Sequence, residues 1–148
     1  MIFSRVFSPE SIILDIKSGD KESLFKEMLQ AMHSARPVFN PDEAFASIIE
    51  RENKMSTGIM HSIAVPHGSI DSLEGSIGAV GICRGGIDYG SLDGSPVYLV
   101  FMLLCGRGET ELHLDVLKSL ALVLQHNDIV QDILSKKTSR EVFDALCE

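Results

Sequence analysis

Cationic, hydroxyl and imidazole side chains gather in one short stretch of the chain, residues 51–68, which reads RENKMSTGIMHSIAVPHG. Arg51 carries a permanent planar cation whose geometry suits phosphate oxygens. Ser56 and Thr57 precede a glycine in a turn that can offer hydroxyls and backbone N–H groups to an anion. His67 has an imidazole that is largely neutral, and hence nucleophilic, near neutral pH. These residue types together suit the chemistry of a phosphoryl group.

The residues on either side of His67 predict how it is held. Pro66 locks its own φ and favours an extended conformation at the preceding residue, so we expect His67 just beyond a short strand, 63–65. Functional groups of open α/β sheets gather at the carboxyl ends of strands. Gly68 lacks a Cβ atom, which allows the backbone of a partner or ligand to approach closely.

Each of these signals also has an ordinary structural interpretation. A histidine beside a proline is commonly a loop residue, and Arg51 near a helix end can simply complement the macrodipole. Ser-Thr-Gly is a common turn composition. Residue types and spacing alone therefore leave the function open.

Strands alternate with helices along the chain, which predicts an α/β layered domain with a mixed, largely parallel central sheet flanked by helices. The almost continuous apolar run 97–104 is typical of a central strand covered on both faces. No linker or repeat divides the chain, so residues 1–148 are expected to form a single domain. The predicted strands are 11–16, 63–65, 77–83 and 97–104, and the predicted helices begin after Asp20, Asn40 and Thr138 and at Thr110.

Two capping boxes and one turn add local detail. Asn40, followed by a proline at the first helical position and by Glu43, predicts a capping box. Thr138 and Glu141 show the same pattern. Gly85-Gly86 predicts a turn after the strand 77–83.

The formal net charge of −8 is divided equally between residues 1–74 and 75–148. An acidic chain without a basic stripe lacks the electrostatic pattern of a nucleic-acid binder, and anionic membranes are equally poor partners. The amino terminus lacks a signal-peptide pattern, and the longest apolar run, 97–105, is too short to span a bilayer. A cytoplasmic protein without direct membrane insertion is therefore expected.

The three cysteines are Cys83, Cys105 and Cys147, and none forms a Cys-x-x-Cys pair. Cys83 and Cys105 lie in apolar runs and are expected to be small core residues. The cysteines therefore predict no metal site, and the sequence implies no cofactor.

The motif R-E-x-x-x-S-T-G-I, followed by I-A-V-P-H-G, resembles the enzyme IIA domains of the fructose/mannitol class in the bacterial phosphoenolpyruvate-dependent sugar phosphotransferase system. The resemblance extends to the nitrogen-regulatory members of that class. The resemblance covers nearly the whole chain, because the later segment G-I-D-Y-G-S-L-D-G-S-P-V, the apolar strand and the H-L-x-x-L helix follow in the family's order.

The resemblance implies a role for each residue that matches the family motif. His67 matches the histidine that accepts the phosphoryl group. Arg51 and His113 match the residues that hold the phosphoryl oxygens, and Ser56 and Thr57 match the hydroxyl turn that lines the site. Such a protein is a phosphotransferase-system component rather than a free-standing metabolic enzyme. It takes the group from an HPr-like phosphocarrier and passes it to a IIB cysteine.

The chain departs from the family pattern at two places. Met60-His61-Ser62 stands where the family usually has Gly-x-Gly, which adds side-chain bulk at the rim of the site and removes backbone freedom. His61 is expected to be a rim residue, as is Gly68. Cys105-Gly106 replaces a position where the family often has proline.

Three alternatives to sugar transport remain open. The first is a regulatory IIA that controls target proteins by binding them according to its phosphorylation state. The second, from a different class, is a metal hydrolase that uses His61, His67 and His113. No carboxylate stands at H-E-x-x-H spacing, which disfavours it. The third is a binding module that has lost phosphorylation.

Overall fold

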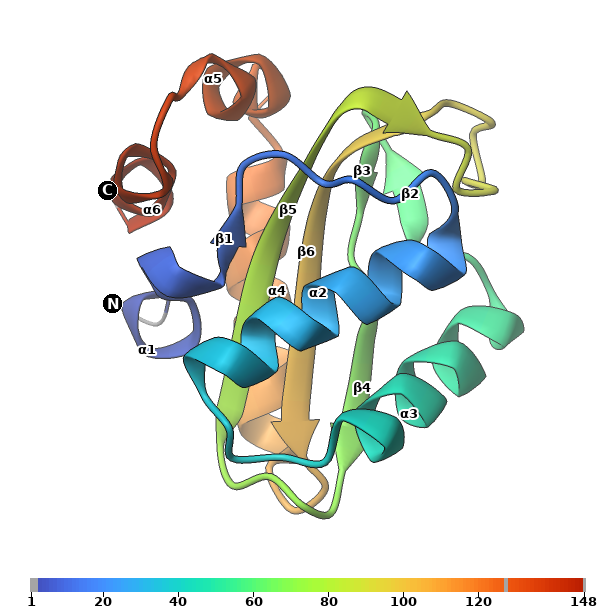
Figure 1. Ribbon diagram of the computed structural model, residues 1–148, viewed down its shortest axis with the longest axis vertical. Helices are drawn as coiled ribbons and strands as arrows, with labels where there is room; N and C mark the ends of the chain where they lie inside the picture. The colour runs from blue at the N-terminus through green and yellow to red at the C-terminus, as the bar shows by residue number, and fades with distance from the viewer. Residues whose placement is uncertain (1–2, 127, 148) are drawn as a thin grey trace.

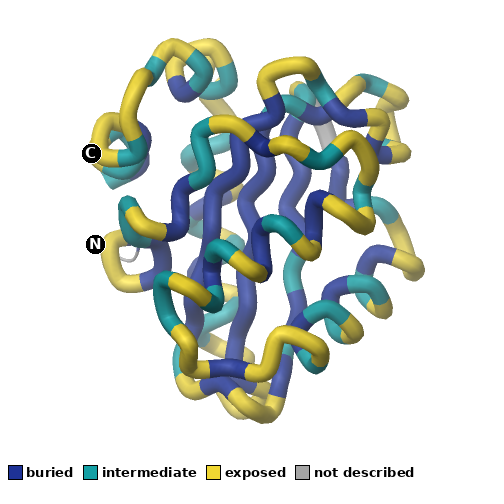
Figure 2. The backbone as a smooth tube through the Cα atoms, viewed as in Figure 1, coloured by how far each residue is buried: buried dark blue, intermediate teal, exposed yellow. Residues whose placement is uncertain are grey.

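Two long buried strands, β5 (Ser76–Ile87) and β6 (Val97–Gly106), form the centre of the sheet in the computed structural model. The structure describes residues 3–126 and 128–147, apart from the side chains of Ile59 and Met60. β5 and β6 run antiparallel, and β6 is buried along nearly its whole length. The predicted central strand is therefore confirmed, and Figure 2 shows the buried middle of the sheet.

The remaining strands are short and extend the sheet on both sides of these two. Among the described residues, three of the five strand pairings are parallel, so the predicted mixed and largely parallel sheet is confirmed, although the longest pairing is antiparallel. The strand order is β1-β5-β6-β3-β2, and β4 also pairs with β6. These strands are β1 (Ile12–Ile13), β2 (Gly58–Met60), β3 (Ile63–Ala64) and β4 (His67–Ile70).

Helices cover both faces of the sheet. Two of them pack on one face, and the others gather on the opposite face with the two ends of the chain (Figure 1). The first face carries α2 (Lys21–Ala35) and α3 (Pro41–Lys54). The second carries α1 (Phe3–Val6), α4 (Thr110–Leu124), α5 (Ile129–Ser135) and α6 (Ser139–Cys147).

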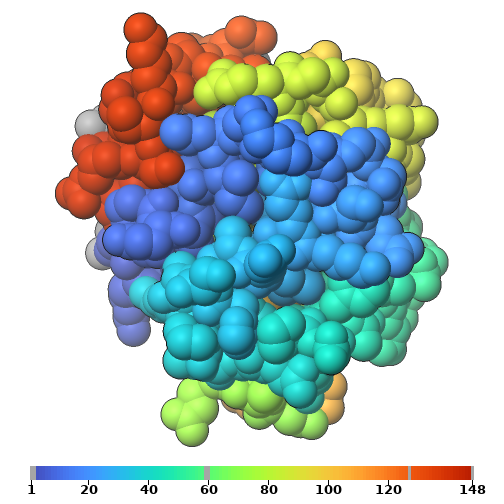
Figure 3. All heavy atoms as spheres, in the orientation of Figure 1, coloured from blue at the N-terminus to red at the C-terminus, as the bar shows by residue number. Residues whose placement is uncertain are grey.

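The side chains of β6 explain why both faces need cover. Val100 and Met102 belong to the apolar cluster beneath α2 and α3, whereas Leu99, Phe101 and Leu103 belong to the cluster beneath α4. Successive side chains of a strand point to opposite faces, so an uninterrupted apolar run requires two helical layers. In the space-filling view the amino-terminal part of the chain covers most of one face (Figure 3).

The helix starts follow the predicted caps, but each of the two predicted capping boxes is only half formed among the described residues. Asp20 accepts a hydrogen bond from the backbone of Ser23, and Asn40 caps α3. Thr138 accepts from the backbone N–H of Glu141, as predicted for α6. Glu43 does not close a capping box. It accepts from Ser72 instead, since the loop after β4 supplies two donors at that helix end.

Two predicted elements are different in the structure. Gly85-Gly86 is not a turn between elements but lies within β5, where the register shifts between Ile82 and Ile87 and Gly86 has a φ of 78°. This irregularity bends the strand without ending it. The predicted strand 11–16 shrinks to β1 because Ser11 closes a 3-10 turn (Pro9–Ser11) and donates its hydroxyl to Gly78 O.

Candidate functional site

His67 lies at a break between two short strands that both run along β6. β3 ends at Ala64, β4 begins at His67, and the carbonyl of Pro66 still accepts a hydrogen bond from Leu103 N at 3.0 Å. Pro66 has no N–H to donate, which interrupts the ladder at this point. His67 therefore lies just beyond the end of β3, as expected, and is also the first residue of the next strand, β4.

The backbone next to His67 determines which ring nitrogen is free. Nδ1 of His67 lies 2.8 Å from Val65 O. A carbonyl can only accept, so Nδ1 carries the hydrogen and Nε2 presents a lone pair. Burial lowers the pKa of His67 below its ordinary value of 6.5, and the nearby Arg51 cation adds to this lowering. The hydrogen bond to Val65 and the charge of Glu52 oppose it. His67 is thus a neutral imidazole at neutral pH.

His113 lies in the first turn of α4, with its ring centroid 5.4 Å from that of His67. Its Nδ1 is buried and has no hydrogen-bond partner among the described residues. A buried N–H without an acceptor is costly, so the hydrogen belongs on Nε2. Burial lowers the pKa of His113, and His67 lowers it further. His113 is therefore a neutral N–H donor beside His67.

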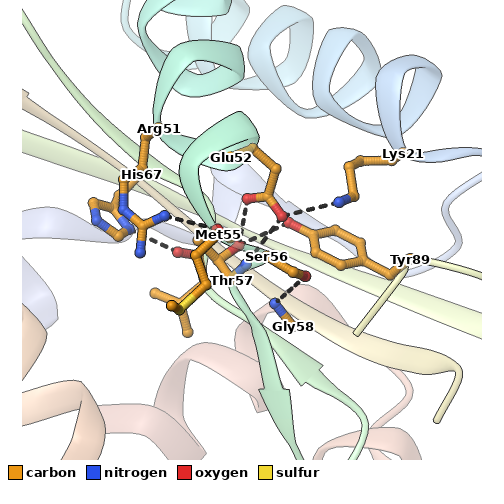
Figure 4. Close-up of polar contacts among 10 residues, drawn as sticks. Lys21, Arg51, Glu52, Met55, Ser56, Thr57, Gly58, His67 and Tyr89 are labelled. Atoms are coloured by element: carbon orange, nitrogen blue, oxygen red, sulfur yellow. Dashed lines mark hydrogen bonds and ion pairs between the residues drawn. The ribbon is translucent and has the colours of Figure 1, made fainter. Parts of the chain in front are cut away.

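Arg51, in the last turn of α3, supplies the cation at this place. Its Nη1 donates to Met55 O at 2.8 Å, which holds the guanidinium over the turn that follows the helix (Figure 4). Arg51 and His67 together line two hollows of about 190 and 230 Å³. The structure thus brings Arg51 to the same place as the histidine.

The two hollows have different walls. The smaller one is walled by apolar side chains of α4, namely Leu117, Leu120, Ala121 and Leu124. The larger one is polar and includes Ser47, Glu50, Lys54, Ser69 and Arg107. His67 therefore stands between an apolar and a polar surface.

Ser56 and Thr57 form the turn after α3, but their polar groups already have partners. Thr57 donates its N–H to Glu52 Oε1 at 3.0 Å and its hydroxyl to Glu52 Oε2 at 2.7 Å. Ser56 Oγ accepts from Gly58 N at 3.1 Å. Thr57 lines the apolar hollow beside His67. The geometry thus gives both residues a part in shaping the turn, and phosphoryl binding through their hydroxyls stays a prediction.

Gly68 is buried, and its missing Cβ has a neighbour within the protein. A Cβ there would meet Ser47 Oγ at 2.5 Å. Ser47 donates its hydroxyl to Ser69 O and accepts from Ser69 N, at 3.0 and 3.1 Å. The glycine therefore allows α3 to pack closely on β4, and this packing sets Arg51, one turn further along the helix, beside His67.

His61 is exposed at the turn that joins β2 to β3, and it is not among the residues that line the two hollows beside His67. Both turn residues are left-handed, with φ of 55° at His61 and 65° at Ser62. Met60 also belongs to the segment Met60-His61-Ser62 that departs from the family pattern, but its side chain lies outside the described part of the structure. No three His, Cys, Asp or Glu side chains within the described residues gather as a possible metal site, so nothing there supports the metal-hydrolase alternative.

Sequence reasoning missed the group of side chains beneath the turn. Glu52 is buried and contacts Lys21 and Thr57, and Thr57 contacts Tyr89 (Figure 4). One signal was present in the sequence. Glu52 continues the four-residue spacing of Ala44 and Ile48 on the buried face of α3, where a carboxylate needs partners.

Comparisons with known proteins identify the family. The chain belongs to the family described as "Phosphoenolpyruvate-dependent sugar phosphotransferase system, EIIA 2", whose model matches residues 5–148. It is 31% identical over 146 residues to the PTS system fructose-specific EIIABC component of Bacillus subtilis (strain 168), covering 99% of this chain but only 23% of that protein. The chain therefore spans about a quarter of the length of that relative.

Two solved structures share the fold. The nitrogen regulatory protein IIA-Ntr from Neisseria meningitidis superposes with a TM-score of 0.90 at 27% identity, covering 99% of each chain. The IIA mannitol enzyme of Escherichia coli, solved in complex with phosphorylated enzyme IIB, has a TM-score of 0.80 at 20% identity, covering 96% of this chain and 99% of that one. Separately, none of the helices described here has the length and apolarity needed to cross a membrane.

Proposed function

We propose that the protein is a phosphocarrier that accepts a phosphoryl group on Nε2 of His67 and passes it on to a cysteine of a IIB domain. The observation that carries this proposal is the contact between His67 Nδ1 and Val65 O at 2.8 Å. It occupies the Nδ1 hydrogen and leaves the Nε2 lone pair free to attack. The role of His67 as acceptor is also what the family motif implies.

Transfer to His67 consists of one bond exchange. The Nε2 lone pair attacks phosphorus, the bond from phosphorus to the donor imidazole breaks, and its electron pair returns to the donor. In the second step a thiolate of the IIB domain attacks phosphorus, and the electron pair of the P–Nε2 bond returns to His67. The charge spreads over the equatorial oxygens during each exchange, so positioned donors and cations lower the barrier.

Arg51 and His113 are the residues that supply this stabilisation in the proposal. Arg51 offers a guanidinium of which one nitrogen, Nη1, contacts Met55 O. His113 offers its Nε2–H from a ring 5.4 Å from that of His67. The donor is an HPr-like carrier, and the cytoplasm is the proposed location, where His67 is neutral.

Two readouts separate sugar transport from regulation. The chain resembles IIA-Ntr over 99% of both chains, which favours a regulatory member of the family as the second candidate. Genes for IIB and IIC proteins next to this gene would indicate transport, and nitrogen-regulation genes would indicate control. A target protein captured by only one of the two phosphorylation states would support regulation.

Phosphorylation itself is tested by intact mass after incubation with phosphoenolpyruvate, enzyme I and HPr. We expect the gain of one acid-labile phosphoryl group that is absent in His67→Ala. Phosphorus NMR should assign it to Nε2 rather than Nδ1. Wild-type protein that gains no phosphoryl group from a competent HPr would contradict the proposal, and a group on Nδ1 would contradict the assigned nitrogen.

A further inference from the structure

A buried carboxylate lies directly beneath the proposed site. The side chain of Glu52 is only 3% exposed, and it follows Arg51 on α3 but points to the opposite side of the turn (Figure 4). It contacts Lys21 Nζ at 3.0 Å, and it accepts from Thr57 N at 3.0 Å and from Thr57 Oγ1 at 2.7 Å. A carboxylate is tolerated at this depth only when it is paired and hydrogen-bonded in this way.

One chain of hydrogen bonds leads from this carboxylate to His67. Glu52 holds Thr57 N, Thr57 O accepts from Val65 N at 3.0 Å, and Val65 O holds Nδ1 of His67. The position and the tautomer of the His67 ring therefore depend on the backbone that Glu52 anchors.

A second route leads from the same turn to Arg51. The carbonyl of Met55, two residues before Thr57, accepts from Arg51 Nη1. Arg51 and Glu52 are neighbours on the helix, and both hydrogen-bond to the turn that follows it, Arg51 at Met55 and Glu52 at Thr57. If this turn moved, the position of the Arg51 guanidinium relative to the His67 imidazole would change.

Tyr89 and Lys21 complete the surroundings of Glu52. The Thr57 hydroxyl donates to Glu52, so the Tyr89 hydroxyl, 2.8 Å from Thr57 Oγ1, donates to Thr57. Burial raises the pKa of the Tyr89 phenol, and the charge of Glu52 raises it further, which keeps this donor protonated. Lys21 Nζ lies 4.3 Å from the centre of the Tyr89 ring. Donors and acceptors in the group are therefore matched: Tyr89 donates to Thr57, and Thr57 donates to Glu52.

We infer that Glu52 is a positioning residue for phosphoryl transfer, which holds His67 and Arg51 in one frame through Thr57, Val65 and Met55 without touching the phosphoryl group. The inference rests on the phosphocarrier function proposed above. It assigns a role to a residue that contacts neither donor nor acceptor of the group.

Glu52→Gln tests this role with little change in shape. The variant keeps an acceptor for Thr57 N but loses the charge that pairs with Lys21 and the second acceptor for the Thr57 hydroxyl. We expect kcat for transfer from phosphorylated HPr to fall about 10- to 100-fold, since a misplacement of reacting groups by about 1 Å can slow a reaction about 100-fold. KM should stay unchanged because Glu52 lies beneath the surface. Glu22→Gln is the matched control, since Glu22 forms an exposed ion pair with Lys26 and should leave kcat at the wild-type value.

A double-mutant cycle distinguishes positioning from general stability. If Glu52 acts partly through Arg51, Arg51→Ala combined with Glu52→Gln should be slowed by clearly less than the product of the two single effects. Fully multiplicative effects, or a wild-type kcat in folded Glu52→Gln, would overturn the inference while leaving the phosphocarrier function intact. Failure of the wild type to accept a phosphoryl group would instead overturn that function.

Urea unfolding decides whether Glu52→Gln is folded under assay conditions. If it is not, Tyr89→Phe replaces it, because this variant removes only the hydroxyl that supports Thr57. It should lower kcat, and Arg51→Ala combined with Tyr89→Phe should be slowed by less than the product of the two single effects. A Tyr89→Phe protein with wild-type kcat would then overturn the inference.

Discussion

The α3 side and the α4 side of His67 are built on different principles. On the α3 side, hydrogen bonds within the protein hold three of the groups near the ring: Ser47 holds Ser69, Glu52 holds Thr57, and the carbonyl of Met55 holds Arg51. On the α4 side, leucines form an apolar hollow, and Nδ1 of His113 has no hydrogen-bond partner within the described part of the chain. The α3 side therefore has the fixed geometry that chemistry needs, whereas the α4 side leaves apolar surface free.

This contrast assigns different tasks to the two sides. Preorganised donors and cations lower a barrier because they need no rearrangement during the reaction. Apolar surface beside them favours contact with another protein and excludes water from the reacting group. Substitutions on the α3 side should therefore affect the chemical step or the stability of the site.

The largest effect is expected for Arg51→Ala. Removing the cation should slow phosphoryl transfer to His67 by about 10²- to 10³-fold, the range found when one preorganised donor is lost. Arg51 is only half buried and donates to the single carbonyl of Met55, so the fold should survive. Transfer rates measured with phosphorylated HPr, alongside circular dichroism, check both points. Loss of the native spectrum would mean that Arg51 is structural.

Gly68→Ala should be the next largest, and it tests the close packing of α3 on β4. The added methyl group would meet Ser47 Oγ at 2.5 Å and Ser47 Cβ at 3.0 Å, so the Ser47 hydroxyl has to rotate away from Ser69 or α3 and β4 have to move apart. Overpacking of this kind costs about 1–3 kcal/mol of unfolding free energy. Urea unfolding measures this cost, and the transfer rate shows whether the shift reaches Arg51. The companion variant Ser47→Gly makes room for the methyl group, so combining the two should restore part of the lost transfer rate. A Gly68→Ala protein as stable as the wild type would show that α3 is not held tightly.

The sequence predicted much of this frame, for reasons that are visible in particular residues. Asp20, Asn40 and Thr138 are local caps, and the run 97–104 needs no knowledge of distant contacts to be recognised as a central strand. Arg51, His67 and His113 were grouped through the family motif rather than through spacing, and the structure brings them together.

The rest depended on contacts that no local pattern encodes. Glu52 meets Lys21 and Thr57 meets Tyr89 across 31 and 32 residues of chain, so their network could not be seen in the motif itself. Gly85-Gly86 has the composition of a turn, yet the pairing of β5 with β6 resumes after it. Gly68 suggested room for a ligand, whereas the space is taken by Ser47.

The pH dependence of His67 offers a finer test of the charges on the α3 side. Burial and Arg51 hold the pKa of His67 below 6.5, so the ring should stay neutral and reactive down to that pH and become protonated only below it. Removing the cation in Arg51→Ala should raise the pKa toward 6.5, and removing the charge in Glu52→Gln should lower it.

Proton NMR of the imidazole measures these shifts directly. His113 faces the same ring, and Glu50, Lys54 and Arg107 line the adjoining polar hollow, so Lys54→Met serves as the comparison for an exposed charge. Its effect should be smaller than that of Arg51→Ala. Equal shifts in the two variants would mean that the general surface charge, rather than Arg51, controls the pKa of His67.

The smallest effect is expected at the hairpin turn, which belongs to neither side. Ser62 has a φ of 65°, a conformation that costs an ordinary residue about 1–2 kcal/mol and glycine almost nothing. Ser62→Gly should therefore raise the unfolding free energy by up to about 1 kcal/mol, after the greater freedom of glycine in the unfolded chain is counted. The carbonyl of Ser62 already accepts from Tyr98 N at 2.9 Å, so the turn is anchored to β6 with either residue. The rate of transfer to His67 should consequently stay unchanged. A changed rate would show that the turn helps to set the site, and that the α3 side does not fix its geometry alone.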